Sequence, residues 1–213
     1  MIFRDGFFDQ LPFLLAALIP ALTFHEWAHA AVAYSQGDRT AQRAGRLSLN
    51  PFVHLDVFGT MAIFFIGFGW AKPVPVNPSE MRGKWSEFLV AGAGPATNLI
   101  LGIVFALLLR WNVASLFGEN YSSFFISLFQ ISMILNFALC FFNLIPIGPL
   151  DGSTLMARLL PLRSSLNYEN WNARFGSLLL LGLIFMDLLL PINILRNLIW
   201  TPSMLLARWI VSA

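Results

Sequence analysis

The sequence predicts an all-α fold: a polytopic transmembrane helical bundle with one re-entrant segment and one helix that is broken by prolines. Hydrophobic residues make up 57% of the 213 residues and charged residues only 11%, which lies outside the usual range of soluble domains. Several apolar runs also reach the roughly 20 residues that a helix needs to cross a bilayer. No internal repeat or soluble-looking block interrupts the pattern. We therefore expect a single integral-membrane domain over residues 1–213.

The first two predicted spanning helices cover residues 11–36 and 87–109. The first is apolar and long enough to cross the membrane, and Gly37 and Asp38 end it. The second opens with a cluster of small residues at 92–98, and small residues let helices approach closely in lipid. These two segments are expected to form the centre of the bundle.

The second half of the chain contains a helix at 122–160 that is broken near 146–149, where two prolines interrupt the backbone hydrogen bonds. Irregular backbone at membrane depth is tolerated only where it is buried in protein or lines a wet cavity, so this break indicates a site. A polar loop is expected at 163–174. Apolar helices at 175–190 and 192–210 complete the chain, and the last could span the membrane or lie at its interface.

Residues 57–70 are predicted to enter the membrane and return to the side that they left. Their ~14 residues reach only about 21 Å as a helix, well short of the roughly 30 Å hydrocarbon core. With such a re-entrant segment, most basic residues of the connecting loops fall on one side. The positive-inside rule identifies that side as the cytoplasm. A short tilted crossing is the alternative.

The first helix carries the motif His25-Glu26-Trp27-Ala28-His29, an HExxH pattern. On a helix the two histidines lie on one face and can converge on one zinc ion, with Glu26 beside the open coordination position. Ionisable residues at membrane depth are costly and are usually retained for function. The alternative is a pair of helix histidines that bond to backbone or water.

A catalytic zinc ion normally takes three protein ligands, so the two histidines need a partner. A metzincin-like extension is excluded, because Val32 and Ser35 stand where glycine and histidine would be needed. Asp151 and His54 remain as candidates. Depth favours Asp151, since it and His29 would both lie roughly 10 to 13 Å below the same surface. Asp151 could instead cap the helix that follows it.

His54 and Asn143 are candidates for a second catalytic role. Either side chain could donate a hydrogen bond to the oxyanion that forms when a carbonyl is attacked. Each also has a structural alternative: His54 could anchor the loop 50–56 through Asp56, and Asn143 could satisfy backbone groups freed at the proline break.

Charge and cysteine content exclude other classes of function. The net charge of +2 is small, and the basic residues lie in short loops that suit topology signals, so no nucleic-acid partner is expected. Cys140 is the only cysteine, which excludes a disulfide within the chain and a CxxC zinc site. We interpret its thiol as a packing group.

Together these motifs resemble the site-2 protease family of intramembrane zinc metalloproteases, in particular short prokaryotic-type members without PDZ or CBS domains. The resemblance rests on five motifs in the same order as in the family: 25–29, 45–51 followed by 54–56, 69–77, 93–98 and 143–152. It implies that Asp151 is the third zinc ligand and that Glu26 is the general base. Val57 and Gly148 stand where the family usually has proline, and the final ~40 residues match none of its motifs.

The sequence thus predicts an intramembrane endopeptidase that holds one zinc ion per chain and cleaves peptide bonds in or near transmembrane segments. Its partners would be a membrane-protein substrate and the lipid bilayer, in a multi-pass protein of a prokaryotic plasma membrane with the site toward the cytoplasm; no pattern specifies an oligomeric state. The alternatives are a membrane zinc transporter and a catalytically silent homologue. A transporter needs several metal sites along a path, whereas all three histidines lie within residues 25–54.

Overall fold

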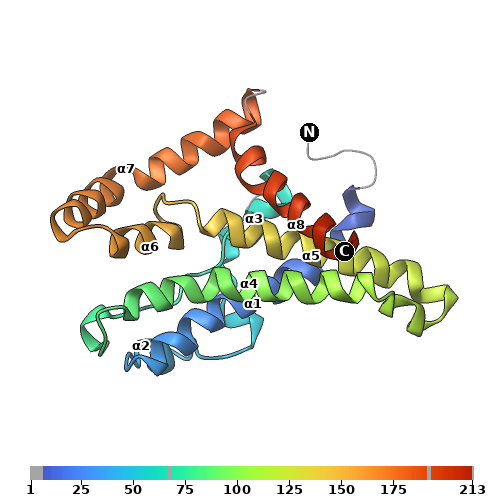
Figure 1. Cartoon of the computed structure of the whole chain (residues 1–213), viewed down its shortest axis with the longest axis horizontal. Coiled ribbons are helices and arrows are strands. Elements are labelled where there is room, and N and C mark those ends of the chain that lie inside the picture. The colour runs from blue at the N-terminus through green and yellow to red at the C-terminus, as the bar shows by residue number, and fades with distance from the viewer. Residues whose placement is uncertain (1–6, 67–68, 191–192, 213) are drawn as a thin grey trace.

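The computed structural model describes residues 7–66, 69–190 and 193–212, and this part of the chain is helical with irregular connections. Three of its helices are long and apolar enough to cross a membrane: α1 (Phe7–Ser35), α4 (Ser86–Arg110) and α5 (Glu119–Asn143). They lie side by side as the centre of the molecule (Figure 1). The predicted all-α transmembrane bundle is confirmed.

The end of α1 and the start of α4 lie together on one side of the bundle. The backbone N–H of Arg82 donates to Gln36 O over 3.0 Å, and Ser86 Oγ donates to the Gln36 side chain over 2.9 Å. Just after α1, Asp38 accepts a hydrogen bond of 2.7 Å from the backbone N–H of Asn77. The chain between α1 and α4 therefore returns to the side that it left, as a re-entrant segment must.

That returning chain contains two short helices and one extended stretch. After α2 (Thr40–Arg43) and η1 (Pro51–Val53), the chain forms α3 (Val57–Ile66), which at ten residues extends only about 15 Å. Residues 69–77 then run back in an extended form to η2 (Pro78–Glu80) and the start of α4 (Figure 1). Prolines at alternate positions keep this stretch extended, and Lys72 N donates to His54 O over 2.8 Å.

The predicted proline break separates α5 from α6 (Asp151–Leu159). Residues 144–150 between them, here called the break loop, hold both prolines and form no helix. The break loop thus ends α5 and leads directly into α6, so that Asp151 is the first residue of the new helix.

The prediction of a polar loop at 163–174 is wrong, because these residues belong to helix α7 (Leu162–Leu189). The predicted apolar helix at 175–190 is only the second half of this longer helix. Hydropathy predicted two separate segments because the first half is rich in polar residues, yet these residues form a helix that contacts the break loop. Tyr168 Oη donates to Pro146 O over 2.7 Å, which ties the polar half of α7 to the break loop.

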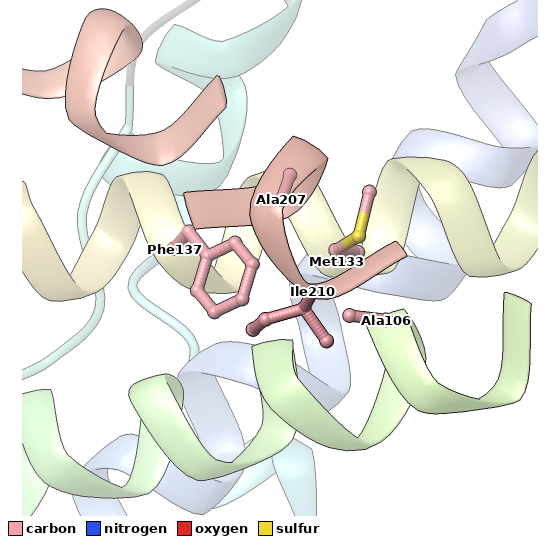
Figure 2. Packing of buried hydrophobic residues seen from close by; sticks show 5 residues of the cluster. All are labelled: Ala106, Met133, Phe137, Ala207 and Ile210. Carbon is pink, nitrogen blue, oxygen red and sulfur yellow. The ribbon is translucent and has the colours of Figure 1, made fainter. Parts of the chain in front are cut away.

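The final segment is helical over residues 194–212; residue 192 of the predicted helix lies outside the described residues. A π-helical turn, η4 (Arg196–Trp200), continues into α8 (Thr201–Ser212). The backbone N–H groups that begin it donate to the Asp187 carboxylate at the end of α7. α8 closes the core against α4 and α5 through five buried residues (Figure 2): Ala106, Met133, Phe137, Ala207 and Ile210.

Candidate metal centre

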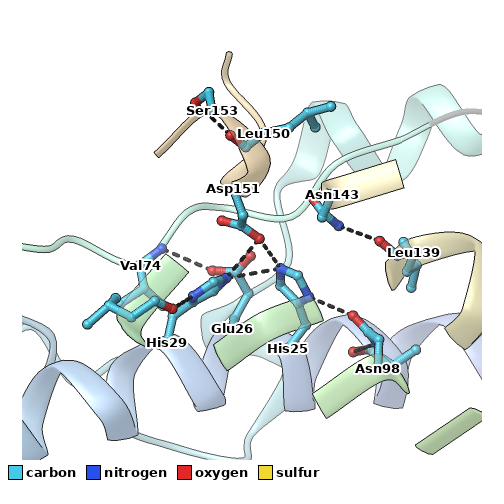
Figure 3. Close-up of polar contacts among 12 residues, drawn as sticks. His25, Glu26, His29, Val74, Asn98, Leu139, Asn143, Leu150, Asp151 and Ser153 are labelled. Atoms are coloured by element: carbon cyan, nitrogen blue, oxygen red, sulfur yellow. Dashed lines mark hydrogen bonds and ion pairs between the residues drawn. The ribbon is translucent and has the colours of Figure 1, made fainter. Parts of the chain in front are cut away.

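Two histidines of α1 and one aspartate of α6 meet at a single point (Figure 3). The Nε2 atoms of His25 and His29 are 3.1 Å apart, and Asp151 Oδ2 lies 3.2 Å and 3.3 Å from them. Tetrahedral zinc with bonds of about 2.0–2.2 Å keeps its ligand atoms about 3.3 Å apart. The triangle formed by these three atoms therefore has the size that one zinc ion requires.

The hydrogen bonds behind the histidines aim their lone pairs at this point. His29 Nδ1 lies 2.7 Å from Val90 O, and a carbonyl can only accept, so Nδ1 carries the hydrogen. His25 Nδ1 likewise lies 2.6 Å from Asn98 Oδ1. Both Nε2 atoms are then free to act as ligands, which is how metal-binding histidines are normally oriented. Among the described residues, buried Asp151 Oδ2 has no hydrogen-bond partner, so three acceptor atoms converge without a donor.

A chain of amides fixes the orientation of Asn98. Asn136 Nδ2 donates to Ser132 O over 2.8 Å, which leaves Asn136 Oδ1 to accept from Asn98 Nδ2 over 2.9 Å. Asn98 Nδ2 also donates to Ala21 O over 3.2 Å. Both backbone oxygens can only accept, so Asn98 must present Oδ1 to His25. Helices α4 and α5 thereby determine the tautomer of a residue on α1.

Gly94 allows α4 to pass directly behind the two histidines. A Cβ atom built at this position would lie 2.4 Å from His29 Nε2 and 2.6 Å from His25 Nε2. Contacts that short do not occur between non-bonded atoms, so no residue with a side chain fits here without displacing the histidines. The close approach also buries the site: His25 is 5% and His29 8% exposed.

Asp151 reaches the histidines from the first position of α6. The residue that precedes this helix, Leu150, makes no side-chain cap, and the Asp151 carboxylate faces the histidine pair (Figure 3). The capping role considered as the alternative for Asp151 is therefore not what its side chain does. Its contact with His29 is also the one that equal depth below a common surface predicts.

Glu26 lies beside this group, and the extended stretch holds it there. Its Oε2 accepts a hydrogen bond of 3.0 Å from the backbone N–H of Val74 (Figure 3). On the other side of the stretch, the buried guanidinium of Arg46 donates to Lys72 O. The carboxylate is thus fixed by a segment distant in sequence, and at 9% exposure it is nearly withdrawn from bulk solvent.

A cavity of about 540 Å³ opens onto these groups. The extended stretch 69–77 forms one wall, and the break loop with the ends of α5 and α6 forms another. Six lining residues bear on chemistry: His25, Glu26, His29, Val74, Asn143 and Asp151. The metal-sized triangle, a carboxylate and a space for a ligand therefore share one compartment.

The two residues predicted to stabilise an oxyanion lie in different surroundings. Asn143 lines the cavity, with Nδ2 donating to Leu139 O over 3.0 Å. His54 is 1% exposed and is absent from the cavity lining; its Nε2 lies 2.7 Å from Ser48 O. The oxyanion role stays a prediction for both, and for His54 the contacts favour an anchor of its loop, through Ser48 rather than Asp56.

Comparison with known proteins decides the family. The sequence pattern described as "Peptidase family M50" matches residues 13–183, which include all six predicted site residues. The chain belongs to this family, the site-2 proteases. The resemblance drawn from the motifs is thereby confirmed.

Curated relatives of the M50 chain point the same way. YwhC of Bacillus subtilis (strain 168), whose name describes a candidate zinc metalloprotease, is 44% identical over 154 residues, 71% of this chain and 70% of YwhC. Rip2 of Mycolicibacterium smegmatis (strain ATCC 700084 / mc(2)155), named in the same way, is 28% identical over 148 residues, 65% of this chain and 54% of Rip2. No solved structure matches significantly. The described residues include three helices able to span a membrane, so the chain is a membrane zinc metalloprotease.

Several residues that support the site were not predicted from the sequence. Asn98 and Gly94 belong to the small-residue cluster of 92–98, whose composition indicates close helix packing but not which atom faces a histidine. The contacts of Val74 and Val90 use backbone groups, which any residue type would supply. Asn136 is a polar residue in the apolar part of a spanning helix. Because polar side chains are costly at membrane depth, its position alone could have indicated a functional or structural role.

Proposed function

We propose that this M50 protein is an intramembrane endopeptidase that cleaves membrane proteins in or near their transmembrane segments. In this proposal His25, His29 and Asp151 hold one zinc ion per chain, and Glu26 is the general base. The observation that carries the proposal is the triangle of Nε2, Nε2 and Oδ2 atoms, 3.1 to 3.3 Å on each side, whose two histidines lie on a helix apolar enough to span the membrane.

The residues present fit hydrolysis of a peptide bond. Bound zinc would supply polarisation of the scissile carbonyl and a lowered pKa for water. Glu26 faces the same cavity and would take the proton of the attacking water and pass it to the leaving amine. Val74 holds one oxygen of this carboxylate through its backbone N–H, so the base is oriented before a substrate arrives.

Asn143 is the better candidate for the oxyanion. Its amide nitrogen carries two hydrogens, of which one bonds to Leu139 O, and the second remains for a charged oxygen in the cavity. We propose a structural role for His54, as an anchor that fixes the chain beside Lys72. Because Lys72 N donates to His54 O, this anchor also supports the extended stretch that holds Glu26.

The substrate would bind in an extended form. A helical segment hides its carbonyls, so a transmembrane substrate must unwind locally before hydrolysis. The stretch 69–77 forms a wall of the cavity and is already extended, which suits strand addition by such a segment. Apolar residues make up much of the same cavity, in keeping with a substrate that comes from lipid.

The distribution of basic residues supports a cytoplasmic side for the site. We propose that residues 1–213 act as one integral-membrane domain of a prokaryotic plasma membrane, with the site toward the cytoplasm. Basic residues gather in the loops on the side where α1 ends and α4 begins, which is also where α6 ends, since Arg158 pairs with Glu87 there; the positive-inside rule favours the cytoplasm for such loops. Transport of zinc is less well supported, since the described residues contain a single metal-sized cluster.

The test separates binding from chemistry. Glu26→Gln should keep bound zinc and the fold while proteolysis is lost, because Glu26 is the base and not a ligand. His25→Ala should lose both metal and activity. The membrane proteome of cells that produce wild type or Glu26→Gln is compared for uncleaved fragments, with the exposed acid Glu119 changed to Gln as the matched control. Full proteolysis by Glu26→Gln would refute the proposed mechanism.

A further inference from the structure

One face of α7 contacts the break loop over several turns. Tyr168, Asn172, Gly176 and Leu180 follow one another at intervals of four residues, which places them in one row along the helix. Tyr168 Oη donates to Pro146 O over 2.7 Å, and the backbone N–H of Gly148 donates to Asn172 Oδ1 over 2.8 Å. The loop therefore rests on α7 through hydrogen bonds to its own backbone.

Close packing accompanies these bonds. A Cβ atom at Gly176 would lie 2.9 Å from Gly148 O and 2.5 Å from Asn172 Oδ1, so only glycine lets the loop approach this closely. Farther along the row, Leu180 packs with Ile145 and Leu150 at the two ends of the loop. Hydrogen bonds, close contact and apolar packing thus fix the same short segment against α7.

The break loop leads directly into Asp151. Asp151 Oδ2 contacts the two histidines at 3.2 and 3.3 Å, and among the described residues no group donates a hydrogen bond to it, so its position depends on the backbone that carries it. Gly148 lies three residues before Asp151, and its N–H bond to Asn172 is a fixed point in that backbone. Metal ligands must be held to within about 0.5 Å of their productive geometry, which is less than a loosened loop would move.

We propose that Asn172 is a positioning residue for the metal centre: through Gly148 it holds the break loop where Asp151 meets His25 and His29, and thereby sets the affinity for zinc. The inference rests on the proposed role of Asp151 as a ligand. Asn172 lies in the half of α7 that hydropathy predicts as a loop. Its effect on the metal centre is indirect, through its hydrogen bond to the backbone of the break loop.

The test compares three single variants of the full-length protein in lipid nanodiscs. Asn172→Leu keeps the size of the side chain but removes the acceptor, whereas Asn172→Asp keeps an oxygen that can accept from Gly148. Asn170→Leu is the matched control, since Asn170 is exposed and two residues away on the opposite face of α7. The measured quantity is the zinc dissociation constant, obtained by competition with a chromophoric chelator.

We expect Asn172→Leu to bind zinc about 10- to 100-fold more weakly, the usual effect of losing a group that orients a ligand. Asn172→Asp and Asn170→Leu should stay within about twofold of wild type. Cobalt bound to Asn172→Leu should also lose visible absorption intensity, because tetrahedral coordination would be disturbed. Unchanged zinc affinity in Asn172→Leu would overturn the proposal.

A double-mutant cycle separates positioning from general stability. If Asn172 acts through Asp151, then Asn172→Leu should have no further effect on zinc affinity in an Asp151→Ala background. Equal weakening in both backgrounds would overturn the positioning role. Wild-type affinity in Asp151→Ala alone would instead overturn the ligand assignment on which the inference rests. If Asn172→Leu does not fold, Tyr168→Phe takes its place in the same cycle, since it removes only the bond to Pro146.

Discussion

Gly94→Ala should destroy the metal centre by adding a single methyl group. The new Cβ would lie 2.4 Å from His29 Nε2 and 2.6 Å from His25 Nε2. Ordinary non-bonded contacts are about 3.5 Å, so both ligand atoms must move by about 1 Å, half the length of a zinc–nitrogen bond. Displacements of this size cost about a hundredfold in well-organised sites. We expect zinc affinity to fall by at least that factor, and proteolysis with it.

Stability should change much less than zinc binding. Overpacking costs about 1–3 kcal/mol, while replacing glycine by alanine in a helix returns about 1 kcal/mol, so Gly94→Ala should lose about 0–2 kcal/mol. Gly92→Ala is the matched control on the same helix, because its Cβ would meet Leu155 at an ordinary 3.7 Å. Zinc content by mass spectrometry and thermal unfolding by circular dichroism are measured on both. Wild-type zinc affinity in Gly94→Ala would refute this reasoning.

Three further predictions follow from the contacts around the site and the loops. Asn98→Leu should weaken zinc binding about 10- to 100-fold, because His25 loses the acceptor that fixes its tautomer, whereas Asn136→Leu should mainly lower the melting temperature. Ala21 O still orients Asn98 when Asn136 is replaced, so comparable zinc affinities in these two variants would contradict a direct role of Asn98 as the acceptor for His25. Burial tends to raise the pKa of Asp38, but hydrogen bonds from Thr40 and Asn77 outweigh it and lower the pKa, so this carboxylate stabilises the fold above its unfolded pKa. The stability difference between wild type and Asp38→Asn should therefore be full at pH 7 and shrink below about pH 4, measured by thermal unfolding; a gap that widens on acidification would be inconsistent with it. Single cysteines introduced into a Cys140→Ala background should report on topology through an impermeant thiol reagent: three positions should react from the cytoplasmic side and a fourth from the other side. Labelling of Ser48 and Ser79 from opposite faces would exclude a re-entrant segment. The three are Ser48, Ser79 and Ser164, and the fourth is Ser115.

The elements of the site that follow from local periodicity were accessible from the sequence. His25 and His29 are one helical turn apart whatever surrounds them, and their Nε2 atoms do meet. Asp151 could be placed because helix rise converts position in the chain into depth, and the described structure brings its carboxylate to within 3.3 Å of His29. The proline break could be placed for a similar reason, since missing N–H groups interrupt a helix wherever they occur.

What the sequence could not provide depends on contacts between distant elements. The polar half of α7 was taken for a loop because the row that contacts the break loop consists of Tyr168, Asn172 and Gly176, which carry no apolar periodicity. Their partners are backbone groups of the break loop, and backbone groups are the same for nearly every residue type, so the sequence does not indicate such contacts. The acceptor role of Asn98 likewise follows only from the geometry of α1, α4 and α5 together.

The metal centre joins the first spanning helix to a residue that lies beyond the third. During synthesis α1 enters the membrane long before Asp151 leaves the ribosome, so a nascent chain carries the histidine pair without its carboxylate. Two imidazoles alone lack one of the three protein ligands that catalytic zinc normally takes. If His25, His29 and Asp151 are the zinc ligands, as proposed, a chain held at the insertion machinery would be poorly equipped to cut the nascent proteins around it, and the order of the ligands along the polypeptide would delay activity until the bundle is assembled.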